Sequence, residues 1–200
     1  MGKDQIIFGG LMALGSGVSG DYYGSTLPAT AESHAAVDGP GPNLEITVSG
    51  AANGTIVIDM LPDVTPAHVD QITGLAAEGA YDGVVFHRVI DGFMAHTGDV
   101  QFGKQGGDAR MAGRGGSERP DIPAEFSDIP FDRGVVGMAR AQNPNSANSQ
   151  FFIMFDEGYF LNGQYTVVGR VVEGMEVVDA IQRGEPPSEP DVMQTVTVVE

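Results

Sequence analysis

The sequence predicts a mainly β fold in which many short strands close into an antiparallel barrel capped by two α-helices. Three observations support this fold class. Short runs of β-branched and aromatic residues recur along the chain, only two segments show helical spacing, and strands and helices do not alternate as around a parallel sheet. The 29 glycines and 12 prolines fit a chain with many turns.

The composition limits the partners and the chemistry of the chain. Its 200 residues suit one folded domain and a tail. With 27 acidic and 10 basic residues the formal net charge is -17, so we expect no nucleic-acid partner, because phosphates are bound by clustered Lys and Arg. The absence of cysteine excludes disulfides and cysteine nucleophiles. No pattern indicates an obligate interface, and we expect a monomer.

Residues 1–42 differ from the rest and are interpreted as a leader and linker before a folded domain at 43–200. The apolar run at residues 6–14 is too short for stable membrane insertion but has the size of a signal-peptide core. Residues 29–31 have the small-x-small form of a cleavage site. This pattern favours a periplasmic or otherwise exported protein, and a cytoplasmic protein is the alternative.

The folded part is expected to begin with a hairpin. Residues 44–48 and 55–60 have strand patterns, and Asn53 and Gly54 form the residue pair preferred in a tight turn between them. A further short strand is expected around Arg88. Later strands are predicted at residues 134–139, 150–155, 165–172 and 192–199.

Two segments have helical spacing of apolar residues. Thr65 and Pro66 suit the N-cap and the first position of a helix that Gly79 can end, and one face of this helix should cover the open end of a sheet or barrel. The second helix is predicted to start at Met175 and to end before Gly184.

The stretch from residue 98 to 123 is rich in glycine and charge and has no periodicity. A loop of this length in a folded domain is usually functional. We expect Phe126 and Phe131 to pack it against the barrel.

Arg88 lies in an otherwise apolar run. In an alternating strand Phe86, Arg88 and Ile90 would share one face. A guanidinium among apolar neighbours needs a partner or a role, and the alternative is a side chain that extends its charge to solvent. His87, on the other face, is interpreted as a packed structural histidine.

The sequence gives no reason to expect a metal or a cofactor. His87, His96 and Asp99 have no spacing typical of metal ligands. No Gly-x-Ser-x-Gly motif indicates a serine hydrolase.

From about residue 43 to 200 the chain resembles the cyclophilins, a family of barrel-shaped peptidyl-prolyl cis-trans isomerases. Several matches occur in the family's order with compatible gaps: FHRVI at 86–90, GFM at 92–94, GD at 98–99, GMA at 137–139, NSQFFI at 148–153, LNG at 161–163 and VG at 168–169. Residues 144–150 are similar to bacterial members. The resemblance implies a closed eight-stranded antiparallel barrel with two helices and an isomerase that needs no cofactor.

The resemblance also implies site residues. Arg88 matches the catalytic arginine of the family. The walls of the proline pocket are matched by Phe93, Met94, Phe152 and Leu161, a polar pocket residue by Gln150, and the segment whose backbone aligns the peptide by Ala139 and Arg140.

Three positions depart from the family pattern. His96 replaces a glutamine that usually helps to hold the arginine, and its charge is expected to vary near neutral pH. Phe160 stands where tryptophan is common, and Tyr165 where histidine is common.

These residues favour isomerisation of X-Pro bonds in proline-containing peptides and in unfolded or folding proteins. The barrier of about 18–20 kcal/mol reflects amide resonance, so an apolar pocket for the ring and an arginine that stabilises the twisted amide suffice, without a covalent step. The alternative is a proline-peptide binding module or chaperone with weak or no isomerase activity.

Overall fold

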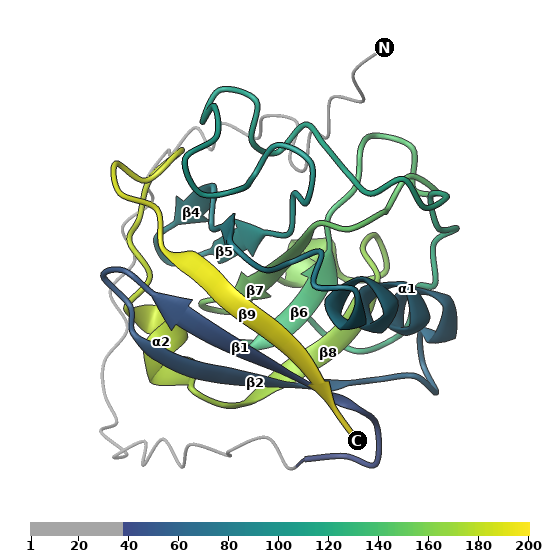
Figure 1. Ribbon diagram of the computed structural model, residues 1–200. Helices are drawn as coiled ribbons and strands as arrows, with labels where there is room; N and C mark the ends of the chain where they lie inside the picture. The colour runs from purple at the N-terminus through teal and green to yellow at the C-terminus, as the bar shows by residue number, and fades with distance from the viewer. Residues whose placement is uncertain (1–37) are drawn as a thin grey trace, which may run out of the picture.

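The computed structural model describes residues 38–200 (Figure 1). Most of the predicted leader, with its apolar run and cleavage pattern, lies outside the described residues. No helix among residues 38–200 combines the length and the apolar character that a membrane span requires.

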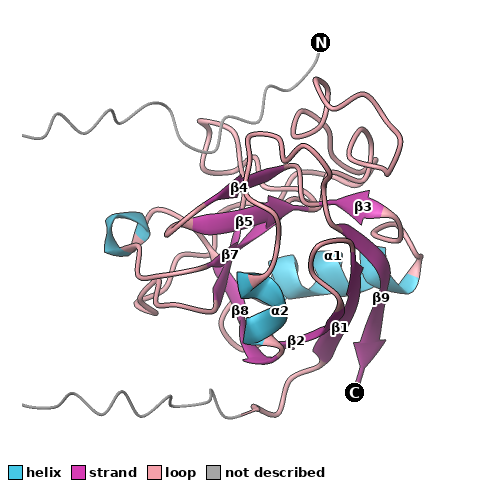
Figure 2. Cartoon of the chain, turned by 90° about the vertical axis from the view of Figure 1, so that its left-hand side faces the viewer, coloured by secondary structure: helices cyan, strands magenta, loops and turns pink. Residues whose placement is uncertain are grey.

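The described chain forms one antiparallel sheet of nine strands with two α-helices and a short 3-10 helix (Figures 1 and 2). The order of the strands is β3-β9-β1-β2-β8-β6-β7-β5-β4. The strands are β1 (Asn43–Ser49), β2 (Gly54–Met60), β3 (Val84–Val85), β4 (Arg88–Ile90), β5 (Met94–Thr97), β6 (Val135–Met138), β7 (Phe151–Met154), β8 (Val167–Glu173) and β9 (Val192–Val199). The helices are α1 (Pro66–Ala77), α2 (Met175–Asp179) and the 3-10 helix η1 (Tyr159–Leu161).

The predicted mainly β class with two helices is confirmed, but the closed eight-stranded barrel is wrong. The sheet curls as a half-barrel whose edge strands, β3 and β4, follow each other in the chain. Between them the backbone changes partners. Phe86 N–H donates to Asp191 O next to β9 (3.0 Å), whereas His87 N–H donates to His96 O in β5 (3.1 Å). No ladder joins β3 to β4 in this part of the chain, and the sheet stays open.

The first hairpin is confirmed, although its turn differs from the predicted one. Gly54 already belongs to β2 and pairs with Val48, so residues 50–53 connect the two strands. The Asn53 side chain donates to Gly50 O within that turn (2.7 Å). The tight turn on Asn53 and Gly54 is therefore wrong, because β1 continues to Ser49 in its pairing with β9.

Helix α1 has the predicted ends. Gly79 has φ 71° after the last turn, a left-handed conformation that glycine adopts readily. At the other end the Thr65 hydroxyl donates to a carbonyl of β8 (3.2 Å) and caps nothing. The carboxylate of Glu125 instead accepts from Ala67 N–H (3.1 Å) and His68 N–H (3.0 Å).

Helix α2 is shorter than predicted, because it ends at Asp179 rather than just before Gly184. The guanidinium of Arg183 donates to the carbonyls of Asp179 and Ile181, each at 2.7 Å. These bonds satisfy carbonyls that a longer helix would have used.

Two apolar clusters lie on opposite faces of the sheet around β4, β5 and β7. Val89, Ala95 and Ile153 belong to the main core, whereas their chain neighbours Ile90 and Met94 belong to a second cluster. Strand neighbours point to opposite faces, so this alternation separates the clusters. The buried members of the second cluster are Met94, Phe131, Val135, Ala139, Phe152, Met154, Leu161 and Val167.

Phe86 does not share a face with Arg88 and Ile90, so this part of the prediction is wrong. Phe86 is fully buried in the main core with Val89, whereas Ile90 packs on the second cluster. The alternation breaks where the backbone changes its pairing partner.

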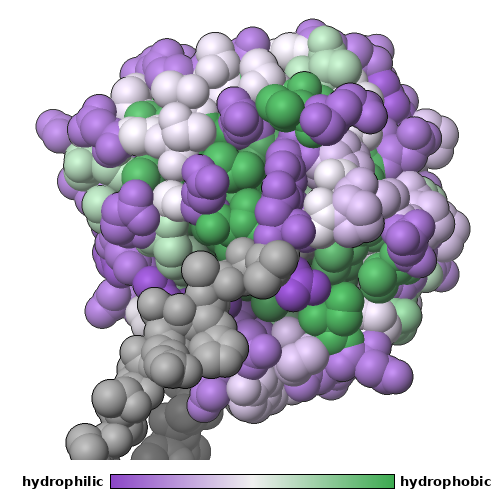
Figure 3. Space-filling model, turned by 90° about the horizontal axis from the view of Figure 1, so that it is seen from below, coloured by the Kyte–Doolittle hydropathy of each residue, from purple (hydrophilic) through white to green (hydrophobic). Residues whose placement is uncertain are grey.

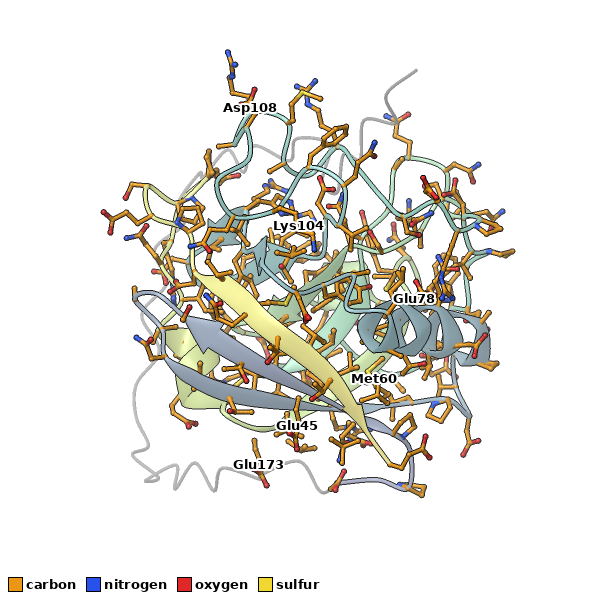
Figure 4. The ribbon with its side chains drawn as sticks, in the orientation of Figure 1. Glu45, Met60, Glu78, Lys104, Asp108 and Glu173 are labelled. Atoms are coloured by element: carbon orange, nitrogen blue, oxygen red, sulfur yellow. The ribbon has the colours of Figure 1, made fainter. Side chains whose placement is uncertain are left out.

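The surface agrees with the acidic composition. Glu45 on β1 and Glu173 at the end of β8 lie on the lower side of the molecule in Figure 4, and the view from below in Figure 3 shows small apolar groups separated by polar side chains. Asp108 lies on the opposite, upper side, on the loop between β5 and β6 (Figure 4).

Candidate functional site

The strand register places Arg88 next to the second apolar cluster. Arg88 on β4 pairs with His96 on β5, His96 pairs with Phe152 on β7, and Phe152 pairs with Gly137 on β6. Directly opposed residues in antiparallel strands share a face, with their Cβ atoms about 5 Å apart. The row therefore carries a cation at one end and a phenyl ring near the other.

Gly137 leaves room for two phenyl rings in this row. A Cβ atom at this position would lie 2.5 Å from Phe152 Cζ and 2.6 Å from Phe131 Cε1. The two rings stack with centroids 5.9 Å apart. Phe131 was expected to pack the long loop and is instead part of the site, whereas Phe126 is 46% exposed and packs poorly.

The residues matched to the proline pocket come together in the second cluster. Met94, Phe152 and Leu161 are fully buried there, and Phe93 packs against them while partly exposed. Phe160 is 62% exposed on η1, and its ring lies 5.5 Å from the ring of Phe93. Phe131, Met154 and Val167 also belong to this cluster, although no motif in the sequence marked them as site residues.

Tyr165 and Arg140 form the far side of the site. The ring of Tyr165 meets Phe152 edge-on at 6.1 Å, and the Arg140 guanidinium lies 4.4 Å from the Tyr165 ring centroid. Arg140 also donates to Gln164 O (2.7 Å) and so joins the segment after β6 to the loop after η1. Ala139 is fully buried, and its N–H donates to Gln150 O (3.0 Å).

Arg88 has a carboxylate partner that the sequence did not reveal. Its Nε donates to Glu185 Oε1 (2.9 Å), and the two side chains are 28% and 55% exposed. Glu185 lies in the loop between α2 and β9, far from Arg88 in sequence. In the sequence Glu185 is only a charged residue before two prolines, and this pattern does not predict a contact with Arg88.

The rings of His87 and His96 meet edge-on next to Arg88. Their ring centroids are 4.1 Å apart, and their side chains are buried. Burial lowers the pKa of His87 to about 4, against an opposing effect of Asp99. Burial also lowers the pKa of His96 well below its usual value, and the neighbouring His87 and Arg88 lower it further. The predicted change of charge near neutral pH is therefore wrong, because both rings are neutral at pH 7.

A buried aspartate holds the long loop beside these histidines. Asp99 Oδ2 accepts from Gly113 N–H (2.7 Å) and Gly115 N–H (3.0 Å), and its Oδ1 accepts from two amides of the next turn. Gln150, matched to a polar pocket residue, is fully buried and donates to Gly113 O (3.0 Å) and Gly115 O (2.7 Å). Both side chains therefore fix the loop. Within residues 38–200, no three His, Asp or Glu side chains form a metal-binding group.

A pocket of about 390 Å³ opens next to Arg88. The sheet contributes His87, Arg88 and His96, and two loops close the other sides. In Figure 1 these are the teal loop above β4 and β5 and the yellow loop beside β4. The loop residues that line it are Ala109, Arg110, Ala112, Gly113, Arg114, Glu185 and Pro186.

Comparison with known proteins identifies the family. The model of the cyclophilin type peptidyl-prolyl cis-trans isomerase family matches residues 43–200. The chain belongs to this family. A probable peptidyl-prolyl cis-trans isomerase of Brucella suis is 65% identical to this cyclophilin over 134 residues, which are 66% of this chain and 68% of that protein. An isomerase of Arabidopsis thaliana is 36% identical over 136 residues, covering 65% of this chain and 78% of that protein.

Solved structures agree with this assignment. The cyclophilin AquaCyp293 from Hirschia baltica superposes with a TM-score of 0.68 at 28% identity, covering 80% of this chain and 74% of that one. A cyclophilin type isomerase of Cryptosporidium parvum, crystallised in the presence of the dipeptide Ala-Pro, has a TM-score of 0.67 at 23% identity, covering 79% and 99%. The resemblance seen in the sequence is confirmed, and the chain is a peptidyl-prolyl cis-trans isomerase.

Proposed function

We propose that this cyclophilin accelerates rotation about X-Pro bonds in proline-containing peptides and in folding proteins, with Arg88 as the catalytic residue. The apolar cluster around Phe93, Met94, Phe152 and Leu161 grips the proline ring. The Arg88 guanidinium donates to the twisted amide, in which resonance is lost and the nitrogen becomes basic. Lowering the barrier by about 7 kcal/mol corresponds to roughly a 10⁵-fold acceleration.

The observation that carries this proposal is the row from Arg88 through His96 to Phe152 on one face of the sheet. It places a permanent cation beside an apolar cluster, and an arginine keeps its charge and its fork geometry at any working pH. The Ala-Pro dipeptide named for the Cryptosporidium relative supports a proline-containing ligand. Gln150 and Asp99 hold the loop next to Arg88.

The first prediction concerns Arg88→Ala. We expect kcat/KM for a short X-Pro peptide to fall about 10²–10³-fold, mainly through kcat, because the lost donor acts on the transition state. Cis–trans exchange measured by NMR gives the rate. Arg119→Ala is the matched control, since Arg119 pairs with Glu78 at similar exposure (34% and 59%), and its rate should stay within about twofold of wild type.

An Arg88→Ala variant that folds and keeps the wild-type rate would remove Arg88 from the mechanism. Peptide binding by the wild type without any acceleration would instead support the binding-module alternative. The proposed role in folding is tested by a refolding reaction limited by proline isomerisation, which takes tens of seconds without a catalyst.

A further inference from the structure

The pocket next to Arg88 gathers positive charge in a chain that is strongly acidic. Arg88, Arg110 and Arg114 line it, so three of the ten basic residues surround one cavity of a chain with net charge -17. Arg110 is 90% exposed and pairs with Asp108 (3.0 Å) at the rim. The pair has two hydrogen bonds, from Nε to Asp108 Oδ1 (3.1 Å) and from Nη2 to Oδ2 (3.0 Å). Both groups face water, which competes for these bonds, so Arg110 can turn to a second carboxylate.

Two buried side chains lie in the floor of this pocket, and one of them has unused hydrogen-bonding atoms. His87 and His96 are 7% and 2% exposed. Neither ring nitrogen of His87 has a hydrogen-bond partner in the part of the chain that the structure describes, whereas the His96 ring has the Gln150 side chain as a neighbour. Each neutral imidazole carries one N–H donor. The floor therefore offers the His87 N–H as a donor to a group that enters from outside.

One arginine of the pocket, Arg88, already forms an ion pair with a carboxylate of the chain itself. Glu185 accepts from Arg88 Nε at 2.9 Å from a side chain that is 55% exposed. This contact shows that a carboxylate fits against the cationic wall, and its exposure means that another carboxylate can replace it at small cost. Arginine binds carboxylates well because its fork matches two oxygens.

We propose that this pocket is a subsite for an acidic side chain of the substrate, so that the enzyme favours X-Pro peptides with Glu or Asp within two residues of the proline. The inference rests on the proposed function, since Arg88 joins the pocket to the apolar cluster that receives the ring. Arg110 and Arg114 bind the carboxylate, and Glu185 competes with it.

A local subsite and the overall charge of the protein predict opposite effects of an acidic residue on the rate with a peptide substrate. A net charge of -17 repels an acidic peptide at long range, but at about 0.15 M salt the Debye length is about 8 Å and distant charges are screened. Overall charge alone would make acidic peptides the poorer substrates. A preference for acidic peptides requires local positive charge.

The test uses peptides with glutamate scanned over the two positions on each side of the proline, each compared with its glutamine counterpart. For the best position we expect kcat/KM of the glutamate peptide to exceed that of the glutamine peptide about fivefold in the wild type. Arg110→Ala and Arg114→Ala should each bring this ratio toward one, and Glu185→Gln should raise it. Arg119→Ala should leave the ratio unchanged.

Each outcome decides the proposal. A wild-type ratio of one or less at every position overturns it, and so does a raised ratio that survives in the Arg110→Ala/Arg114→Ala double variant. If the glutamine peptides are not accelerated at all, the proposed function fails. The subsite is then judged by the dissociation constants of the same peptide pairs, measured by titration calorimetry, with the same expected order.

Discussion

At the scale of single residues, burial rather than residue type sets the behaviour of the two histidines next to Arg88. Histidine usually titrates near pH 6.5. Here desolvation lowers the pKa of His87 to about 4 and lowers that of His96 well below its usual value. The replacement of a glutamine by His96 therefore introduces a neutral ring at working pH.

This neutrality predicts a flat pH profile. We expect kcat/KM of the wild type for an uncharged X-Pro peptide to change by less than about twofold between pH 6 and 8, because neither buried ring gains a proton there. Stopped-flow or NMR exchange rates across this range give the measurement. A titration step near pH 6.5 that disappears in His96→Gln would contradict the prediction.

The same pKa shift predicts a loss of stability in acid. Between pH of about 4 and 6.5 the unfolded chain binds a proton at His87 that the native chain does not bind. The free energy of unfolding therefore decreases as the pH falls through this window and is fully retained above it. A shift of about 2.5 units corresponds to about 3 kcal/mol in total, of which about 2 kcal/mol is lost between pH 7 and 5.

Urea unfolding at pH 7 and pH 5 measures this loss. His87→Gln is the control, because its side chain does not titrate and its stability should depend less on pH by about that amount. An equal dependence in both proteins would show that His87 does not contribute.

At the scale of elements, the loop between β5 and β6 is fixed by side chains that lie outside it or at its start. The Asp99 carboxylate accepts hydrogen bonds from four backbone amides of this loop, and the Gln150 side chain donates hydrogen bonds to two of its carbonyls. A loop without regular structure thus forms a defined wall of the arginine pocket.

This arrangement predicts that Asp99→Asn is costly. The amide group of asparagine would face main-chain donors in place of an acceptor, and we expect the free energy of unfolding to fall by about 3 kcal/mol. Hydrogen exchange at the amides of Gly113 and Gly115 should accelerate before global unfolding. Asp108→Asn is the matched control in the same loop, and its exposed side chain should cost less than about 0.5 kcal/mol. Similar losses in both variants would show that Asp99 does not hold the loop.

At the scale of the whole molecule, local patterns located most elements but not how the sheet ends. The strands and α1 were predictable because alternation and capping residues act over a few positions. The open edge depends on two bonds, from Phe86 to Asp191 and from His87 to His96. Their partners are distant or belong to another strand, and no local pattern specifies them.

The candidate site was predictable to the extent that family motifs carry it. Arg88, Phe93, Phe152 and Leu161 came from those motifs. Glu185 and Phe131 did not, because each reaches the site through a loop whose path depends on the whole fold. The protonation state of His96 could not be predicted from the sequence either, because it depends on the burial of the ring.

The two short edge strands have a further consequence for a protein that meets extended chains. Val89 exchanges two main-chain hydrogen bonds with Gly184 beside β4 (2.8 Å each), and Val85 N–H donates to Gly103 O beside β3 (2.8 Å). An uncovered edge is a template on which foreign strands add and aggregate. Because loops of the chain itself bond to both edge strands, these edges are less open to the addition of a foreign strand.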